Sequence, residues 1–478
     1  MRPLRYLFAA LLCLALGPAL AQEGGGDEGI EVSEDPEEKP APKDGGYDEE
    51  EARKKDVGLA GGGEDQGDPD APKVKADLQT RINKAIENGV KWLKEKQDKD
   101  GSWGPVKANR KYGTHETGDF ERDRLGPTAF AIYALAKCGV KSTDRVVGKG
   151  MKWLSDRARM GHDSTASGKD AQGKVGYHVY TTYESAAVIL MIEAVYERSA
   201  KLTGSHKKRA LYTDNALKPP ERSRIPEEDW TWLQDRVLSL TVGHVFSVGG
   251  ARGKGKSTTT ARGYQRPKGG WRYDQGSSDD DLSSTQFALL GLRAASQAGY
   301  PFDRVAPDVW KKAAEYVKSM QLGDGGFCYQ RGEAYRASMD ACGVGSLLIC
   351  KEQMELLGQA PPAWMDESIR KGLAHLDQAF SPTENKGYLD GASHLYYYLY
   401  AVERVGDMTG RKEFAGLDWY LRGAELLLSH QDADGKWIDG TGFQPHDVLG
   451  TTFALLFLKR ATIPVVTVSE KSPPPAGE

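Results

Sequence analysis

A twelve-residue pattern that occurs three times constrains the fold of this chain more than any other feature. The three copies are WLKEKQDKDGSW at residues 92–103, YVKSMQLGDGGF at 316–327 and LLLSHQDADGKW at 426–437. Each has Gln at its sixth position, Asp-Gly at its ninth and tenth, and an aromatic residue at its twelfth. Asp-Gly favours a turn after a helix, and the aromatic ring can stack over that turn. We therefore predict that each copy is a structural staple that ends a helix, with its Gln hydrogen-bonded to free amides of the next helix.

A second, looser repeat places a small residue three and four positions before bulky or apolar residues, which puts them on one helical face. Its small residues are Gly89, Gly150, Ala313, Gly372 and Gly423, and Asp229 begins a degenerate sixth copy. After each copy comes a more uniformly apolar helical segment; these segments begin near residues 127, 181, 282, 338, 393 and 451. An amphipathic helix can lie on a surface, whereas a helix that is apolar nearly all round must be buried.

Six alternations of an outer and an inner helix predict an all-α fold, a single closed (α/α)6 toroid over residues 76–464. Long inserts at about 157–180, 199–226 and 244–275 account for the uneven spacing of the repeats. The N-termini of the inner helices should converge on one rim. We expect an apolar cavity with a polar mouth at that rim.

The two ends of the chain differ in composition from its body. Arg2 and Arg5 precede an apolar run and Ala19-Leu20-Ala21 suits cleavage, so residues 1–21 predict a signal peptide. From residue 22 to 72 there are 18 Asp and Glu against 5 Lys and Arg, so residues 22–75 predict a disordered acidic linker. Residues 465–478 predict a disordered tail. We expect an exported protein, periplasmic or extracellular, without a transmembrane segment, since no mature apolar run is long enough to span a bilayer.

Charge and cysteine content argue against two classes of protein. The net charge of the chain is −4, and the part that remains without the signal peptide and the linker is only mildly positive. This charge does not indicate a nucleic-acid-binding protein. Cys138, Cys328, Cys342 and Cys350 are too few for a disulfide framework in a body of this size. Cys342 and Cys350 would lie two helical turns apart, too far to bridge, so we expect thiols that are free or bind something.

The outer-helix residues followed by Gln-x-x-Asp-Gly-x-Trp resemble the QW repeat of squalene and hopene cyclases, which is similar to the repeat of protein prenyltransferase β subunits. The resemblance covers residues 78–462 and implies the toroid fold, although fold alone does not fix a reaction. Triterpene cyclases carry two such barrels, so a single toroid is closer to the β-subunit plan. The resemblance implies a long apolar ligand, an isoprenoid-like molecule or a lipid, and it is compatible with peripheral membrane contact; the sequence identifies no protein partner.

One motif resembles the zinc site of protein prenyltransferases, which hold the metal with Asp-x-Cys on one inner helix and His at the start of the next. Asp340, Cys342 and His394 match this pattern, and together they form a catalytic-type zinc set with an open fourth position. Ala334 and Ala337 stand where the family places the Arg and Lys that grip a diphosphate. The alternative is that Cys342 is a small buried apolar residue and His394 a helix cap.

A second motif, SSDDDLSSTQFALL, falls where cyclases carry their acid motif. Asp280 and Asp281 match the final pair of that motif, while Ser278 and Leu282 depart from it. The resemblance implies that this pair is catalytic, because a carboxylic acid kept protonated in an apolar cavity can donate a proton to an alkene. Aromatic faces can then hold the resulting cation. The alternative is that both carboxylates cap the helix that follows.

Two hypotheses for function stay open. In the first, the chain is a prenyltransferase- or terpene-cyclase-like enzyme with zinc- or acid-assisted chemistry on an isoprenoid-like substrate. In the second, it is a non-catalytic binding or scaffold module in the cell envelope, tethered by the acidic linker. Export weakens the first hypothesis, because such substrates are normally cytosolic. A carbohydrate-active toroid ranks last, because the inner helices carry no Trp platforms.

Metal analysis of the purified protein tests the zinc hypothesis. If Asp340, Cys342 and His394 hold zinc, we expect about one equivalent per chain, because these three side chains complete a single coordination sphere with one open position. The Cys342→Ser variant should then lose the metal. Zinc at the same level in that variant would contradict this ligand set.

Overall fold

The computed structural model describes residues 71–104, 124–158, 182–196, 225–242, 246–247, 258–259, 265–272, 280–388, 391–438 and 447–460. Residues from Arg81 onward belong to one compact unit. A second unit, Ala15–Thr80, is described only from Ala71, where the first outer helix begins. The predicted signal peptide, most of the predicted linker and the predicted tail lie outside the described residues.

Helices make up nearly all of the regular structure. The outer helices are α3 (Ala71–Lys96), α5 (Arg145–Ala158), α7 (Glu227–Val242), α10 (Val309–Ser319), α12 (Trp364–Ala379) and α14 (Trp419–His430). The inner helices are α4 (Leu125–Lys137), α6 (Thr182–Tyr196), α8 (Leu282–Gln297), α11 (Ala337–Leu356), α13 (Leu395–Thr409) and α15 (Asp447–Lys459). The described residues also contain a one-turn helix, α9 (Phe302–Val305), and four two-residue strands: β1 (Phe246–Ser247), β2 (Thr258–Thr259), β3 (Glu413–Phe414) and β4 (Leu417–Asp418). The strands form two small antiparallel hairpins, β1–β2 and β3–β4.

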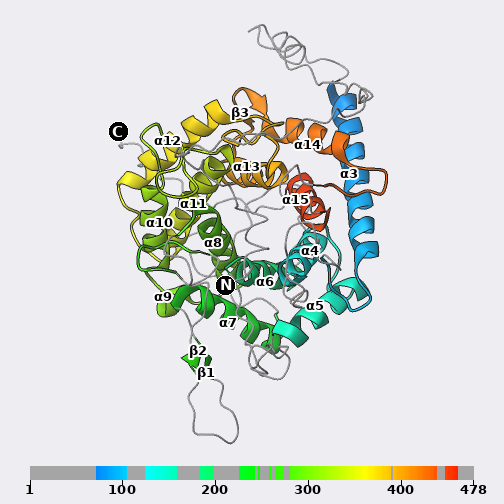
Figure 1. The fold of residues 1–478 in the computed structure, drawn as a ribbon, viewed down its shortest axis with the longest axis horizontal. Helices are drawn as coiled ribbons and strands as arrows, with labels where there is room; N and C mark the ends of the chain where they lie inside the picture. Colours follow the sequence, from blue (N-terminus) through cyan, green and yellow to red (C-terminus); the bar gives the residue numbers. More distant parts are fainter. Residues whose placement is uncertain are drawn as a thin grey trace, which may run out of the picture. The chain divides into compact units, whose positions relative to one another are not determined.

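The inner helices form a closed ring (Figure 1). Along the chain, each inner helix packs against the next, from α4 through α6, α8, α11 and α13 to α15, and α15 packs against α4. The outer helices α5, α7, α10, α12 and α14 pack around this ring. The predicted single toroid of alternating outer and inner helices is therefore confirmed.

Burial follows the predicted difference between the two kinds of helix. In α4 every residue from Leu125 to Leu135 is buried. In α10 only one stripe is buried, at Val309, Trp310, Ala313, Ala314, Tyr316 and Val317, which recur at helical spacing. The inner helices therefore supply the core, and each outer helix contributes one face to it.

The aromatic residues of the three staples occupy equivalent turns, as predicted. Trp103, Phe327 and Trp437 have no exposed surface. In both Trp staples the indole N–H donates to a carbonyl of the outer helix that has just ended, Leu93 at 2.8 Å or Leu427 at 2.7 Å. The ring therefore fixes the turn to its own helix, and the Trp N–H is satisfied although it is buried.

The main-chain N–H of each aromatic residue is bonded to the inner helix that follows. The acceptor is Thr128 Oγ1 for Trp103 (2.9 Å), Asp340 Oδ1 for Phe327 (2.7 Å) and Thr451 Oγ1 for Trp437 (3.0 Å). All three acceptors lie in the first turns of inner helices and have no exposed surface. Each staple therefore joins an outer helix to the next inner helix through one buried polar side chain.

The structure contains a fourth staple, Gln265–Trp271, that the sequence analysis missed. Its Trp271 N–H donates to Thr285 Oγ1 at 3.1 Å, and its indole N–H donates to the carbonyl of Leu240 at 2.9 Å. In the sequence this segment falls within the expected long insert 244–275, because Lys-Gly replaces Asp-Gly at the turn. The geometry of the turn depends on the glycine and tolerates the lysine.

The staple Gln residues act differently from the prediction. Instead of accepting from free amides, each Gln Nε2 donates to a main-chain carbonyl of the neighbouring outer helix. The pairs are Gln97 with Val146 (2.8 Å), Gln265 with Val309 (2.9 Å), Gln321 with Ser368 (2.9 Å) and Gln431 with Ala85 (2.9 Å). The amide also donates to the glycine carbonyl of its own turn, at 2.9 to 3.1 Å. The Gln431 bond joins the last outer helix, α14, to the first, α3, and so closes the outer ring.

Glycine is required where a staple turn touches the next outer helix. Gly269 has a φ of 94°, and a Cβ there would lie 1.9 Å from the carbonyl oxygen of Lys312. The small residues of the looser repeat serve the same close packing from the other side. A Cβ on Gly150 would lie 2.9 Å from the Trp103 ring, and one on Gly372 would lie 2.9 Å from the Phe327 ring.

Two further expectations concern cysteines and membranes. Cys138, Cys328, Cys342 and Cys350 are all free, whereas the sequence predicts only that some of these thiols are free or bind something. Within the described ranges, no helix is both long and apolar enough to cross a bilayer.

Replacement of Gln431 tests how much ring closure stabilises the fold. Gln431→Glu keeps the shape but removes both N–H donors, and it places a carboxylate against two carbonyl oxygens. We expect the free energy of unfolding, measured by urea denaturation, to fall by about 1–3 kcal/mol. The control is Gln378→Glu on the exposed face of α12, which should change it by less than about 0.5 kcal/mol. Equal effects of the two substitutions would contradict this role.

Candidate functional site

Asp281 lies at the N-terminus of α8 and caps that helix. Its Oδ1 accepts from the main-chain N–H of Ser284 at 2.6 Å, and its Oδ2 accepts from Ser284 Oγ at 2.8 Å. Arg272 Nη1 donates to Oδ2 at 2.9 Å. Burial raises the pKa of the fully buried Asp281, and the Arg272 guanidinium opposes this rise.

Asp280 is also buried, but its surroundings differ. Its side chain is 4% exposed and Oδ1 lies 3.1 Å from Arg266 Nε, an ion pair that lacks hydrogen-bond geometry. The side chain packs beside Gly270 and near the ring of Tyr316, which belongs to the outer helix α10. Burial raises the pKa of Asp280, and the nearby Arg266 opposes the rise. Of the two predicted acids, Asp280 has the less saturated carboxyl.

Asp340 and Cys342 point to different sides of α11. Besides accepting from Phe327, the Asp340 carboxylate lies 2.9 Å from His375 Nδ1, on the outer helix α12. The Cys342 sulfur lies 3.0 Å from Tyr397 Oη, on the inner helix α13. Side chains two residues apart on an α-helix point in directions that differ by about 200°. The separation of Asp340 and Cys342 therefore follows from helix geometry.

His394 is the residue before α13. Its φ of 58° is left-handed, it makes no capping hydrogen bond with its side chain, and its ring meets Tyr388 edge-on at 5.5 Å between centroids. Among the residues that the structure describes, no three or more His, Cys, Asp or Glu side chains form a group that could hold a metal ion. The structure thus does not bring Asp340, Cys342 and His394 together, and zinc binding stays a prediction for metal analysis.

Aromatic rings from five of the six inner helices meet inside the ring. Phe287 packs against Phe130 at 5.6 Å, Tyr183 at 5.0 Å and Tyr397 at 6.0 Å between centroids. Phe453 joins them through Phe130 and Tyr397. These rings are at most 2% exposed, so they fill the space that they face with their own side chains.

A small polar network lies within this aromatic cluster. Tyr397 Oη lies 3.0 Å from Ser283 Oγ, 3.0 Å from Cys342 Sγ and 3.1 Å from Gln286 Oε1. Burial raises the pKa of the Cys342 thiol to about 12. A thiol with that pKa is protonated at neutral pH, so it is a poor nucleophile in this state.

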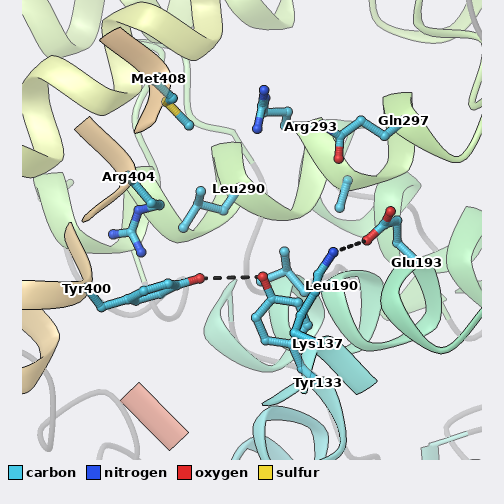
Figure 2. Close-up of a pocket in the computed structure, with 11 residues that line it drawn as sticks. Tyr133, Lys137, Leu190, Glu193, Leu290, Arg293, Gln297, Tyr400, Arg404 and Met408 are labelled. Atoms are coloured by element: carbon cyan, nitrogen blue, oxygen red, sulfur yellow. Dashed lines mark hydrogen bonds and ion pairs between the residues drawn. The ribbon is translucent and has the colours of Figure 1, made fainter. Parts of the chain in front are cut away.

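A pocket lies between the C-terminal halves of the inner helices α4, α6, α8 and α13 (Figure 2). Its cavity volume is about 30 Å³. The lining combines aliphatic, aromatic and charged side chains from these four helices: Tyr133, Lys137, Leu190, Glu193, Leu290, Arg293, Ala294, Gln297, Tyr400, Arg404 and Met408. The sequence predicts the cavity mouth at the opposite end of these helices, at their N-termini.

Most charged groups of the pocket are already paired. Lys137 Nζ lies 3.3 Å from Glu193 Oε2, and both side chains are at most 10% exposed. Arg293 makes a bidentate pair with Glu352 at 2.7 and 2.9 Å. The hydroxyls of Tyr133 and Tyr400 lie 3.5 Å apart. The sequence feature that could have indicated this pocket is the presence of charged residues near the C-terminal ends of otherwise apolar helices.

Comparison with known proteins agrees with this fold. The sequence profile of the squalene-hopene cyclase C-terminal domain matches residues 73–195, about a quarter of the chain. Over these residues the match confirms the predicted resemblance to squalene and hopene cyclases. No curated protein sequence matches the chain.

Among solved structures, one similar protein is a variant of the type II terpene cyclase MstE from Scytonema in complex with geranylgeranyl dihydroxybenzoate. It is 10% identical, with 81% of this chain and 99% of that chain covered and a TM-score of 0.45. A possible member of the GH105 family from Salmonella enterica is 12% identical, with 80% and 93% covered and a TM-score of 0.44. A glycosidase in complex with glucose is 14% identical, with 80% and 97% covered and a TM-score of 0.43.

The His375–Asp340 pair predicts a pH dependence. The hydrogen bond to Asp340 raises the pKa of His375 above its usual 6.5. A raised histidine pKa in the folded state stabilises the fold below the unfolded pKa, and this contribution is lost as pH rises through the folded pKa. The melting temperature of the protein relative to His375→Gln should therefore be highest near pH 6 and should fall above about pH 6.5. A pH-independent difference would contradict the pairing.

Proposed function

We propose that this chain is a non-catalytic binding module, exported to the cell envelope, whose toroid holds a hydrophobic small molecule or a lipid. The observation that carries this proposal is the engagement of Asp281. Three donor groups from Ser284 and Arg272 engage both oxygens of its carboxylate. A proton donor for an alkene needs a protonated carboxyl that faces the substrate, and this carboxylate faces its own helix cap.

The place for the ligand is the pocket at the C-terminal ends of the inner helices. Leu190, Leu290 and Met408 give it apolar walls. Sites for whole drug-sized ligands have volumes of about 300–1,000 Å³, so the cavity of about 30 Å³ holds only one end of a long ligand. The rest of such a ligand would extend beyond the cavity.

The enzyme alternative rests on Asp280. This carboxyl is buried, its pKa is raised by burial, and its Oδ1 makes no hydrogen bond. These properties suit a general acid better than those of Asp281. Acid-assisted chemistry on an isoprenoid-like substrate is therefore the second candidate, with Asp280 as the proton donor.

Binding and turnover can be measured on one long apolar alcohol, geranylgeraniol. We expect saturable quenching of Trp fluorescence and complete recovery of the unchanged alcohol by gas chromatography and mass spectrometry. Ala294→Met, which extends a pocket-lining side chain into the cavity, should weaken binding about tenfold, the effect of losing one good apolar contact.

The matched variant for chemistry is Asp280→Asn, which should bind the alcohol like the unmodified protein. A cyclised or otherwise altered product that disappears in Asp280→Asn would establish the enzyme alternative. Binding that is equal in Ala294→Met would place the ligand outside this pocket.

A further inference from the structure

We propose that the pocket between the C-terminal halves of the inner helices is a site for an anionic group, a carboxylate or a phosphate, held by Arg404 and Gln297. The inference rests on the proposed binding function, because it assigns the chemistry of the ligand end that enters the cavity. It follows from hydrogen-bond donors in the pocket that have no acceptor.

Arg404 is the first of these donors. It lies on α13, lines the pocket and is 2% exposed. Within the described part of the chain, neither Nη1 nor Nη2 has a hydrogen-bond partner, so the neighbouring Glu403 does not accept from either nitrogen. The guanidinium carbon lies 4.0 Å from the ring centroid of Tyr400 (Figure 2). A cation–π contact holds the guanidinium in place but leaves its N–H groups unsatisfied.

Gln297 is the second donor. Gln297 is the last residue of α8 and lines the same pocket. Its Nε2 is buried and has no hydrogen-bond partner among the residues that the structure describes. Two helices therefore contribute side chains with unsatisfied N–H groups to the lining of one pocket. A carboxylate or a phosphate offers several lone pairs to such donors.

The charges around the cavity favour an anion. Glu193 is paired with Lys137 and Glu352 with Arg293, so these carboxylates are already neutralised. Arg404 remains as a buried cation in the pocket, and no carboxylate of the described residues accepts a hydrogen bond from its Nη1 or Nη2. Burying a charge without a counter-charge is expensive, and a bound anion removes that cost.

Size supports the same assignment. A cavity needs roughly 10–15 Å³ to hold one water molecule, so about 30 Å³ suits a group of a few atoms. Leu190 and Leu290 beside it can contact the first carbons of an attached chain. The geometry thus fits the charged end of an amphipathic molecule, such as a fatty acid or an alkyl phosphate.

Calorimetric titration with matched ten-carbon ligands tests this inference. Decanoate, decyl phosphate and 1-decanol differ only in their head groups, and acetate supplies a carboxylate without a chain. We expect decanoate or decyl phosphate to bind the full-length protein at least about tenfold more tightly than 1-decanol, the size of one hydrogen bond to a charged group. Whichever of the two binds more tightly identifies the head group.

Arg404→Met should abolish this preference, Gln297→Leu should reduce it, and Arg404→Lys should keep part of it. Arg370→Met on the exposed surface of α12 is the control and should change nothing. The ligand-free Arg404→Met protein should melt no lower than the unmodified one, because it no longer buries an unpaired charge. If Arg404 only packed on Tyr400, its removal would lower the melting temperature instead.

The outcomes separate this inference from the proposed function. Equal affinity for decanoate, decyl phosphate and 1-decanol overturns the anionic site and leaves the binding function standing. An anion preference that survives in Arg404→Met also overturns it, because the anion then binds elsewhere. Acetate that binds as tightly as decanoate supports the anionic site and contradicts a hydrophobic ligand. No binding of any of these ligands contradicts both.

Discussion

The hydrogen bonds of the staple Gln residues are the interaction on which the rest of this fold depends. Outer helices pack on the inner ring, and each Gln amide joins the end of one outer helix to the backbone of the next. The bond between Gln431 and Ala85 links segments 346 residues apart. In an open helical repeat, the last staple Gln would have no following outer helix to bond to. In this closed ring, the last staple Gln, Gln431, bonds to the first outer helix instead.

The staples also determine what the inner-helix N-termini can do. The aromatic N–H of each staple needs a buried acceptor, and Thr128, Thr285, Asp340 and Thr451 supply it. Asp340 thus occupies the position that threonine holds in three other repeats. Its carboxylate has one oxygen more than the staple needs, and that oxygen binds His375. A structural requirement of the repeat accounts for an acidic residue at this place.

The sequence was sufficient for the fold because its two periodicities are local. Each staple turn, and each apolar stripe along a helix, is encoded by about a dozen consecutive residues. The number and alternation of these segments therefore predicted the toroid. The Gln265–Trp271 staple was not predicted, because a single Lys replaces the Asp of the turn. The direction of the Gln hydrogen bonds was not predicted, because a Gln side chain can both donate and accept. Only the positions of the neighbouring helices decide whether it donates or accepts.

The candidate site was less predictable, for a physical reason. Motif resemblance pointed to Asp280, Asp281, Asp340, Cys342 and His394, all at inner-helix N-termini, where staples and caps also require polar residues. The pocket at the other end is built from Lys137, Glu193, Arg293 and Arg404, which are far apart in the sequence and share no motif. Which of these charges are paired depends on side-chain distances between helices, and no local pattern encodes those distances.

The side chains at the two ends of the ring are therefore under different constraints. At the N-terminal end, polar side chains are engaged by staples and caps, and aromatic rings fill the interior beside them. At the C-terminal end the helices need no staples, so charged side chains there are under a different constraint. Arg293 and Lys137 satisfy it with carboxylate partners, which is the usual condition for a buried charge. Among the described residues, no carboxylate accepts a hydrogen bond from Nη1 or Nη2 of Arg404, and a bound anion would supply the missing counter-charge.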